Sequence, residues 1–191
     1  MAYIGLAKPY ISKLKDETTS PEGVTTPTYE KGFKCGKAIN VNITPNYNEA
    51  KLYADNILDE YAKEFKDGTV KLGTDRLPIE AQGVVFSHET SEDGKTVNYK
   101  TGDNANWVGV GVYVEEILDG KKQYVAIVLY KCKFTEAAMD YETKGENITF
   151  KTPSIEGSVS ALEDTRWKTT KSFEKEIEAE NFIKTTLNIT E

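Results

Sequence analysis

The chain has few of the residues that most often carry chemistry. Its 191 residues include one histidine, two cysteines and two tryptophans. Cys35 and Cys132 lie far apart, and neither belongs to a C-x-x-C pair, so no zinc or redox motif is indicated. Both lie in apolar, strand-like segments, which favours two small buried side chains. A disulfide between them is left open.

The patterns of the common catalytic sites are also missing. No G-x-S-x-G elbow is present, and no glycine-rich phosphate loop follows a strand. His88 has polar neighbours and a turn follows it, which predicts an exposed loop residue and not a general base. Three short groups of acidic and amide residues are the candidate metal ligands. They are typical of solvated turns and lack a calcium-loop pattern: Glu89 with Glu92 and Asp93, Asp55-Asn56, and Asp103-Asn104. We therefore predict a protein that is not an enzyme, with no catalytic residue, metal or cofactor.

The charge and the hydropathy exclude further classes. The net charge is -7 and no cluster of lysines or arginines stands out, so binding of nucleic acid through its phosphates is not indicated. The mean hydropathy is -0.53. No apolar run approaches the ~20 residues of a membrane span, and the N-terminus lacks the pattern of a signal peptide. We expect a soluble protein of one domain, residues 1–191, that folds in a cytoplasm.

The 11 Tyr, seven Phe and 14 Gly favour sheets and turns over a helical bundle. The segment from Trp107 to Phe134 predicts two strands that reverse at Asp119-Gly120. Pairing about that turn gives one apolar face and one mixed face. The predicted pairs are Val114 with Val125, Val112 with Ile127, Val110 with Leu129, Tyr113 with Ala126, Gly111 with Val128 and Gly109 with Tyr130.

The second of these strands, Tyr124 to Tyr130, is apolar on both faces. A sheet with one face in water would alternate with polar residues, so both faces must be covered, and a neighbouring subunit is a serious candidate. Gly109 and Gly111 inside the first strand suggest close approach of another element, an aromatic ring over the bare backbone such as Tyr130, or local curvature.

The other elements are less distinct. The expected strands lie at Tyr3–Leu6, Phe33–Ile43, Ile148–Phe150, Ser158–Ser160 and Arg166–Thr169, and the polar segment 15–28 predicts a mobile loop. Residues 52–65 show helical spacing at Tyr53, Ile57, Tyr61 and Phe65, yet a hairpin signal follows. A short helix is expected with Pro78 in its first turn, capped by Asp75 or another small polar residue just before it. A C-terminal helix is expected with Ser172 as its N-cap and Ile177, Phe182, Ile183 and Leu187 near one face.

The order of these blocks resembles the major tail protein, or tail-tube protein, of long non-contractile-tailed bacteriophages. The resemblance covers almost the whole chain. The matching blocks are Gly32–Asn56, Glu64–Ala81, Asn106–Phe134 and Thr143–Val159, followed by Trp167. None of these blocks is a catalytic signature, and no catalytic residue is carried over from the family.

The resemblance implies a mainly β fold: a β-sandwich or partly closed barrel of the tail-tube type, with one flanking α-helix and a short C-terminal helix. It implies a hairpin over Glu60–Leu72 around Asp67-Gly68 and a helix at Leu77–Val85. No further immunoglobulin-like domain is expected at the C-terminus. In the family, hexameric rings stack into a hollow tube through which the genome passes.

The implied location is the virion tail, assembled in the host cytoplasm. The implied partners are other copies of the chain and the tape-measure, tail-terminator and tail-tip proteins, with DNA passing through the lumen without specific binding and no membrane. An acidic chain fits this, because a basic lumen would hold the DNA. The alternative is a carbohydrate-binding β-sandwich that stacks sugars on Trp107 and Trp167. A hydrolase on a β-scaffold is the third class.

Overall fold

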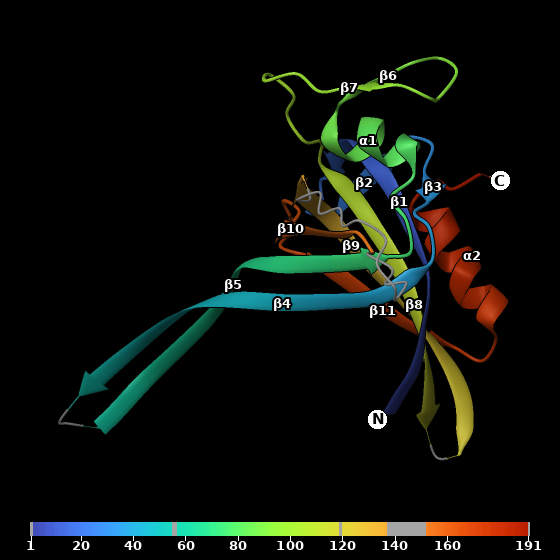
Figure 1. Cartoon of the computed structure of the whole chain (residues 1–191). Helices are drawn as coiled ribbons and strands as arrows, with labels where there is room; N and C mark the ends of the chain where they lie inside the picture. The colour runs from blue at the N-terminus through green and yellow to red at the C-terminus, as the bar shows by residue number, and fades with distance from the viewer. Residues whose placement is uncertain (1, 55–56, 119, 137–151, 191) are drawn as a thin grey trace, which may run out of the picture.

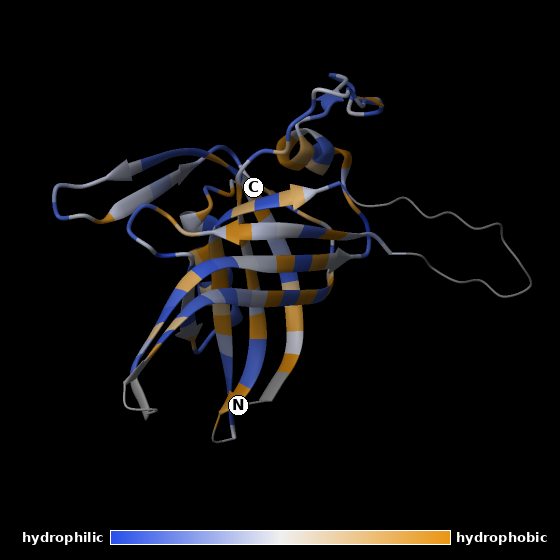
Figure 2. Ribbon diagram, turned by 90° about the vertical axis from the view of Figure 1, so that its left-hand side faces the viewer, coloured by the Kyte–Doolittle hydropathy of each residue, from blue (hydrophilic) through white to orange (hydrophobic). Residues whose placement is uncertain are grey.

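The protein is mainly β. The computed structural model describes residues 2–54, 57–118, 120–136 and 152–190. Within these residues a nine-stranded antiparallel sheet carries the fold, and a two-stranded sheet and two helices accompany it (Figure 1). Figure 2 shows apolar and polar residues alternating along the strands, as expected where a strand has one buried face.

The strands of the large sheet are β1 (Ala2–Thr19), β2 (Thr25–Tyr29), β3 (Phe33–Lys34), β4 (Ala38–Ala54), β5 (Ile57–Thr74), β8 (Val108–Leu118), β9 (Lys121–Thr135), β10 (Ser154–Ser160) and β11 (Lys168–Phe173). The small sheet consists of β6 (Glu89–Thr90) and β7 (Val97–Asn98). The helices are α1 (Ile79–Phe86) and α2 (Glu176–Thr186).

The large sheet divides at β9. One edge of β9 pairs with β8, while its other edge pairs first with β11 and then, from Lys131 to Thr135, with β10. The order continues through β5 to β4, and β4 comes back into contact with β1. The sheet therefore curves around a core that includes Ile11, Leu72 and Leu129. No hydrogen-bonded pairing of β4 with β1 closes it among the described strands.

The β8–β9 hairpin confirms the predicted register. Five of the six predicted pairs form, from Val114 with Val125 to Val110 with Leu129. The pair of Gly109 with Tyr130 does not form, because a register shift lies between Val108 and Val110. At the turn, Gly120 has φ 76°, the left-handed geometry that glycine adopts without cost. Asp119 lies outside the described residues.

The chain itself covers the second face of β9, which corrects the expectation that a neighbouring subunit would do so. α2 packs Ala179, Ile183 and Leu187 against Ala126 and Val128 of β9, and no residue from Tyr124 to Tyr130 is exposed. The two strand glycines make this packing possible. A Cβ on Gly111 would lie 2.3 Å from Ile183 Cγ2, and one on Gly109 would lie 2.6 Å from both Leu187 Cδ2 and Tyr29 Cε1.

Of the three explanations offered for Gly109 and Gly111, the structure confirms the close approach of another element. The aromatic ring at Gly109 belongs to Tyr29 of β2 and not to Tyr130.

Two predicted boundaries are corrected. Segment 15–28 is not a loop: it contains the end of β1, a turn and β2, with Glu17 paired to Pro27 and Thr19 to Thr25. The reversal expected at Asp67-Gly68 does not occur, since Gly68 pairs with Pro45 in the middle of β5. The chain instead reverses between the paired residues Ala54 and Ile57, so residues 52–65 are strand wherever they are described.

Both helices form where predicted, but their N-cap residues differ from the predicted ones. α1 begins after Pro78, and Asp75 does not cap it but accepts a hydrogen bond from the Lys37 N–H at 2.6 Å. The N-cap of α2 is Lys175, while Ser172 belongs to β11. Ile177 does not share the buried face of α2, since it is 55% exposed. The strand predicted at Ile148–Phe150 lies outside the described residues.

Candidate interaction surfaces

The most unusual surface is a two-stranded arm. We define the arm as residues 47–54 of β4 and 57–65 of β5. It continues the two core strands outward and extends away from the rest of the molecule (Figure 1). Of the side chains described in it, all are exposed except Phe65, which is half-buried. The arm is therefore held by little more than its own cross-strand pairs.

One face of the arm carries aromatic rings and two lysines, together with Glu49, which forms a 3.5 Å ion pair with Lys63. Cross-strand pairing sets Tyr47 opposite Phe65, and Lys51 opposite Tyr61. The Tyr47 and Phe65 rings meet edge to face with centroids 6.3 Å apart, and Phe65 stacks on Trp167 at 4.7 Å. The Lys63 Nζ lies 4.3 Å from the centre of the Tyr47 ring. A row of rings therefore runs from the body onto the arm.

The opposite face of the arm is small and acidic, with Ala50 opposite Ala62 and Leu52 opposite Glu60. On the aromatic face Tyr47 is 43% and Tyr61 is 49% exposed, while Leu52 on the opposite face is 53% exposed. Apolar side chains exposed together mark interaction sites more often than apolar residues scattered singly. A two-stranded ribbon is marginally stable alone in water. Both arguments favour a partner surface for the arm.

A second apolar surface lies where β1 begins and the β8–β9 hairpin ends. Ile4, Ile117 and Leu118 are exposed there. Ile117 pairs with Ala2 on one side and Lys122 on the other, so these residues share a three-stranded projection. In Figure 1 this projection and the arm point toward the same end of the molecule.

An ionic cluster fastens α2 to the sheet. The buried Glu180 carboxylate accepts hydrogen bonds from Lys8 Nζ at 2.5 Å and Tyr10 Oη at 2.6 Å, and Lys184 Nζ lies 3.1 Å away. Burial raises the pKa of Glu180, but these three donors outweigh it and lower the pKa to about 2. At the other end of the contact, Tyr113 Oη donates to Glu176.

His88 is buried, contrary to the prediction of an exposed loop residue. Its imidazole lies 4.4 Å from the Tyr99 ring and 5.9 Å from the Phe86 ring, measured between centroids. Asp103 Oδ2 lies 2.7 Å from Nδ1. Asp103 also accepts the Lys100 N–H, and its hydrogen bond from His88 lowers the pKa of its carboxyl group. The sequence gives no sign of this cluster, because Tyr99 and Asp103 lie more than ten residues further along the chain.

The cysteines are free and buried, as the apolar surroundings predict. Burial raises the pKa of the Cys35 thiol to about 12, with the Asp75 carboxylate adding to the effect, and burial alone raises that of Cys132. Neither thiol is therefore a reactive nucleophile at neutral pH.

The indole rings of Trp107 and Trp167, the candidates for sugar stacking, already contact other side chains of the chain. Lys131 Nζ and Lys133 Nζ lie 5.3 Å and 5.7 Å from the centre of the Trp107 ring. Trp167 stacks on Phe65, and Lys168 Nζ lies 4.7 Å from its ring centre. A sugar would compete with these contacts for the indole faces.

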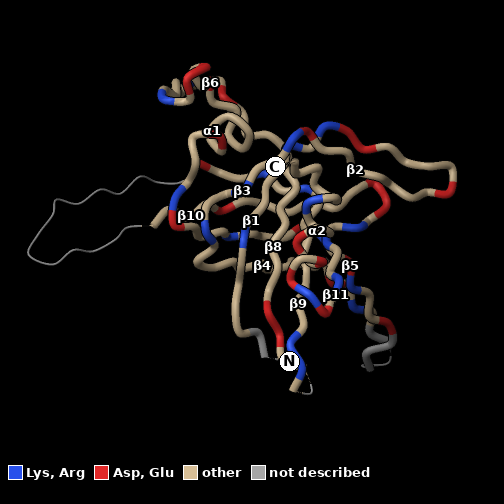
Figure 3. Tube along the Cα trace, turned by 90° about the vertical axis from the view of Figure 1, so that its right-hand side faces the viewer, with Lys and Arg blue, Asp and Glu red and all other residues tan. Residues whose placement is uncertain are grey.

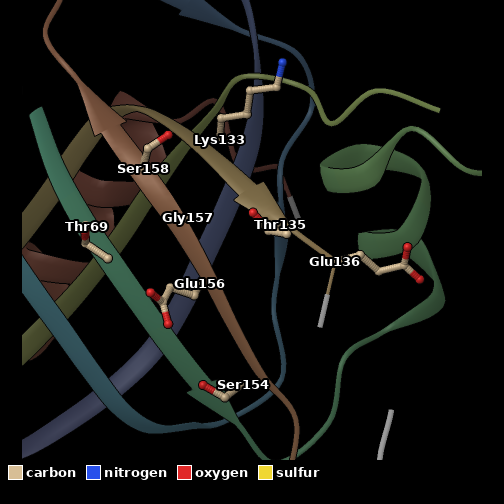
Figure 4. A pocket seen from close by; sticks show the side chains of 8 residues that line it. All are labelled: Thr69, Lys133, Thr135, Glu136, Ser154, Glu156, Gly157 and Ser158. Carbon is tan, nitrogen blue, oxygen red and sulfur yellow. The ribbon is translucent and has the colours of Figure 1, made fainter. Parts of the chain in front are cut away.

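A polar cavity of about 500 Å³ lies on β5, β9 and β10 (Figure 4). Its lining is mostly Ser, Thr and Glu side chains with Lys133, and it lacks apolar anchors. Within the described ranges, no three His, Cys, Asp or Glu residues come together as a metal-binding group. Neither helix of the described chain has the length and apolarity of a membrane span.

No protein-family model matches the chain, and no curated protein matches its sequence.

Proposed function

We propose that this chain is a self-assembling structural protein of the phage tail tube, in which hexameric rings stack into a hollow conduit for DNA. The arm is the observation that carries the proposal. It exposes aromatic and aliphatic side chains on a ribbon too thin to bury them, and other copies of the chain would cover it.

The fold is compatible with the finer architecture that the resemblance implies. The curved sheet, with β4 returning to contact β1, would support a partly closed barrel with α1 and α2 at its sides. β4 is an edge strand, and unpaired edges are the usual route to strand pairing between chains. A contact that is not self-complementary generates rings or filaments. The tape-measure, tail-terminator and tail-tip proteins would be the further partners in the virion.

The charge distribution is also compatible with a conduit. Figure 3 shows Lys and Arg intermixed with Asp and Glu along the chain. The net charge of -7 opposes general attraction between the chain and DNA phosphates. A conduit built from such chains would therefore be suited to letting DNA pass.

The apolar β9 strand does not require a neighbouring subunit, because α2 covers it within one chain. The proposal therefore rests on the arm and on the family resemblance.

The test is electron microscopy of the purified chain over a range of concentrations. We expect rings or hollow rods for the wild type. In a shortened variant, an Asn-Gly turn replaces residues 50–62, which joins the cross-strand partners Glu49 and Lys63. This variant should remain folded, because the core lies elsewhere, but should form no rods.

A matched pair of substitutions refines the test. Tyr61→Ser removes an exposed ring from the arm, whereas Ile177→Ser removes a similarly exposed side chain from α2. We expect weaker assembly only for Tyr61→Ser. Compact monomers at every wild-type concentration, or rods of normal yield from the shortened variant, would contradict the proposal.

A further inference from the structure

The only histidine of the chain is buried with one ring nitrogen unused. The His88 side chain is 6% exposed, and Asp103 Oδ2 lies 2.7 Å from its Nδ1. A carboxylate at Nδ1 holds the proton there and leaves the lone pair of the neutral ring on Nε2. Nε2 is itself buried and has no hydrogen-bond partner. A buried polar atom without a partner requires an explanation.

His88 lines a cavity of about 380 Å³ between the end of α1 and the end of β9. Glu136 Oε2, which also lines the cavity, lies 3.8 Å from Nε2. Figure 4 shows the Glu136 carboxylate beside α1, just beyond the end of β9. The imidazole thus lies between two carboxylates, one touching Nδ1 and one facing Nε2.

We propose that His88 Nε2 and the Glu136 carboxylate bind one divalent transition-metal ion, with Asp103 as the hydrogen-bond partner behind the imidazole. Zinc takes imidazole nitrogen and carboxylate oxygen at about 2.0–2.2 Å, so two such ligands on a tetrahedral ion lie roughly 3.4 Å apart. The separation of 3.8 Å between Nε2 and Oε2 is close to this. The chain then supplies two direct ligands, and water completes the coordination.

The local charges favour a cation of this kind. Asp103 and Glu136 contribute two negative charges to the cavity lining, against one positive charge from Lys133. The Lys133 ammonium group is also directed toward the Trp107 ring, 5.7 Å from its centre. An imidazole ligand selects zinc, copper, nickel or cobalt over calcium and magnesium, which prefer oxygen ligands throughout.

The single histidine makes the test clean. The chain is purified without a polyhistidine tag, and Zn²⁺ and Co²⁺ are titrated by calorimetry and by visible absorption. In addition, ¹⁵N NMR follows the two nitrogens of the one imidazole. We expect saturation at one ion per chain and a shift of the Nε2 resonance on binding Zn²⁺. Tube formation is not required for this result, so the site and the proposed function can fail separately.

Four variants assign the ligands. His88→Gln should abolish saturable binding, and Glu136→Gln should weaken it at least tenfold. Asp103→Asn should weaken it about 10- to 100-fold, the usual effect of losing the partner behind a metal-bound imidazole. Glu92→Gln, an exposed carboxylate in the following turn, should bind like the wild type. Glu136 is 46% exposed, so its variant should fold even if His88→Gln does not.

Three results would overturn the proposal. The first is the absence of saturable binding below millimolar metal. The second is unchanged affinity in Glu136→Gln. The third is a shift on the Nδ1 resonance, which would place the metal on the Asp103 side of the ring.

Discussion

Glu180 shows how a single carboxylate can hold a helix on a sheet. Its pKa of about 2 lies below the unfolded value, because its three donors outweigh the cost of burial. The ionised form therefore stabilises the fold above the unfolded pKa of about 4.3, and this contribution disappears as the pH falls from there toward 2.

Glu180→Gln should lower the free energy of unfolding at pH 7 by about 1–3 kcal/mol, since Lys8 and Lys184 lose their counter-ion. The difference between wild type and variant should shrink as the pH falls from 5 to 2. Urea denaturation at several pH values measures both effects. Glu178→Gln is the control, because Glu178 is exposed and forms only a 3.9 Å ion pair with Lys175. An unchanged difference at pH 2 would contradict this account of Glu180.

Gly111 provides a second residue-scale prediction. A methyl group there would lie 2.3 Å from Ile183 Cγ2, so Gly111→Ala should push α2 away from β8 and cost about 1–3 kcal/mol of stability. Gly102→Ala is the matched control, with no atom within 4 Å of the added group. Urea denaturation compares the two. Equal stabilities would mean that α2 does not rest on this glycine.

The arm is an element whose stability should depend on assembly. Beyond the body, β4 and β5 pair only with each other in the described structure. Their amide hydrogens should exchange rapidly in the free chain, while those of β5 from Val70 to Leu72, paired with both β4 and β10, should exchange slowly. In assembled rods the arm amides should become protected. Hydrogen exchange read by mass spectrometry tests this, and protection of the arm already in the free chain would contradict it.

An element could be predicted from the sequence when residues close together in the chain determine it, and not when it depends on contacts between distant segments. The β8–β9 register was predictable because alternation and a two-residue turn are local signals. The bulge at Gly109 was not, since it depends on the packing of Tyr29 and Leu187. The spacing of residues 52–65 could not decide between helix and strand, because a spacing of four is even and therefore also repeats on one face of a strand.

The packing of α2 over β9 and the burial of His88 were not predicted, because both depend on contacts between segments that lie far apart in the sequence. α2 lies some fifty residues beyond the strand that it covers, and no local pattern joins them. Gly109 and Gly111 did predict close approach of another element, yet their sequence context could not say that the element was the C-terminal helix. The arm as a candidate surface likewise appears only once the reversal is placed between Ala54 and Ile57.

The charge of the whole molecule gives a prediction about DNA. If assembled rods form a neutral or acidic conduit, they should not retain duplex DNA at physiological salt, because retention requires many phosphate contacts with Lys or Arg. Co-sedimentation of rods with duplex DNA measures this. Saturable retention with a steep dependence on salt would instead indicate a basic surface created by assembly.

Because β4 and β5 each run without interruption from the core into the arm, the tip is joined mechanically to the centre of the molecule. A pull on the tip along the strands would strain the backbone hydrogen bonds from β5 to β10 all at once, in shear, instead of opening them one after another. Tension entering through the arm would then pass directly into β5 and its partner β10, and a chain of such units would resist stretching along that line.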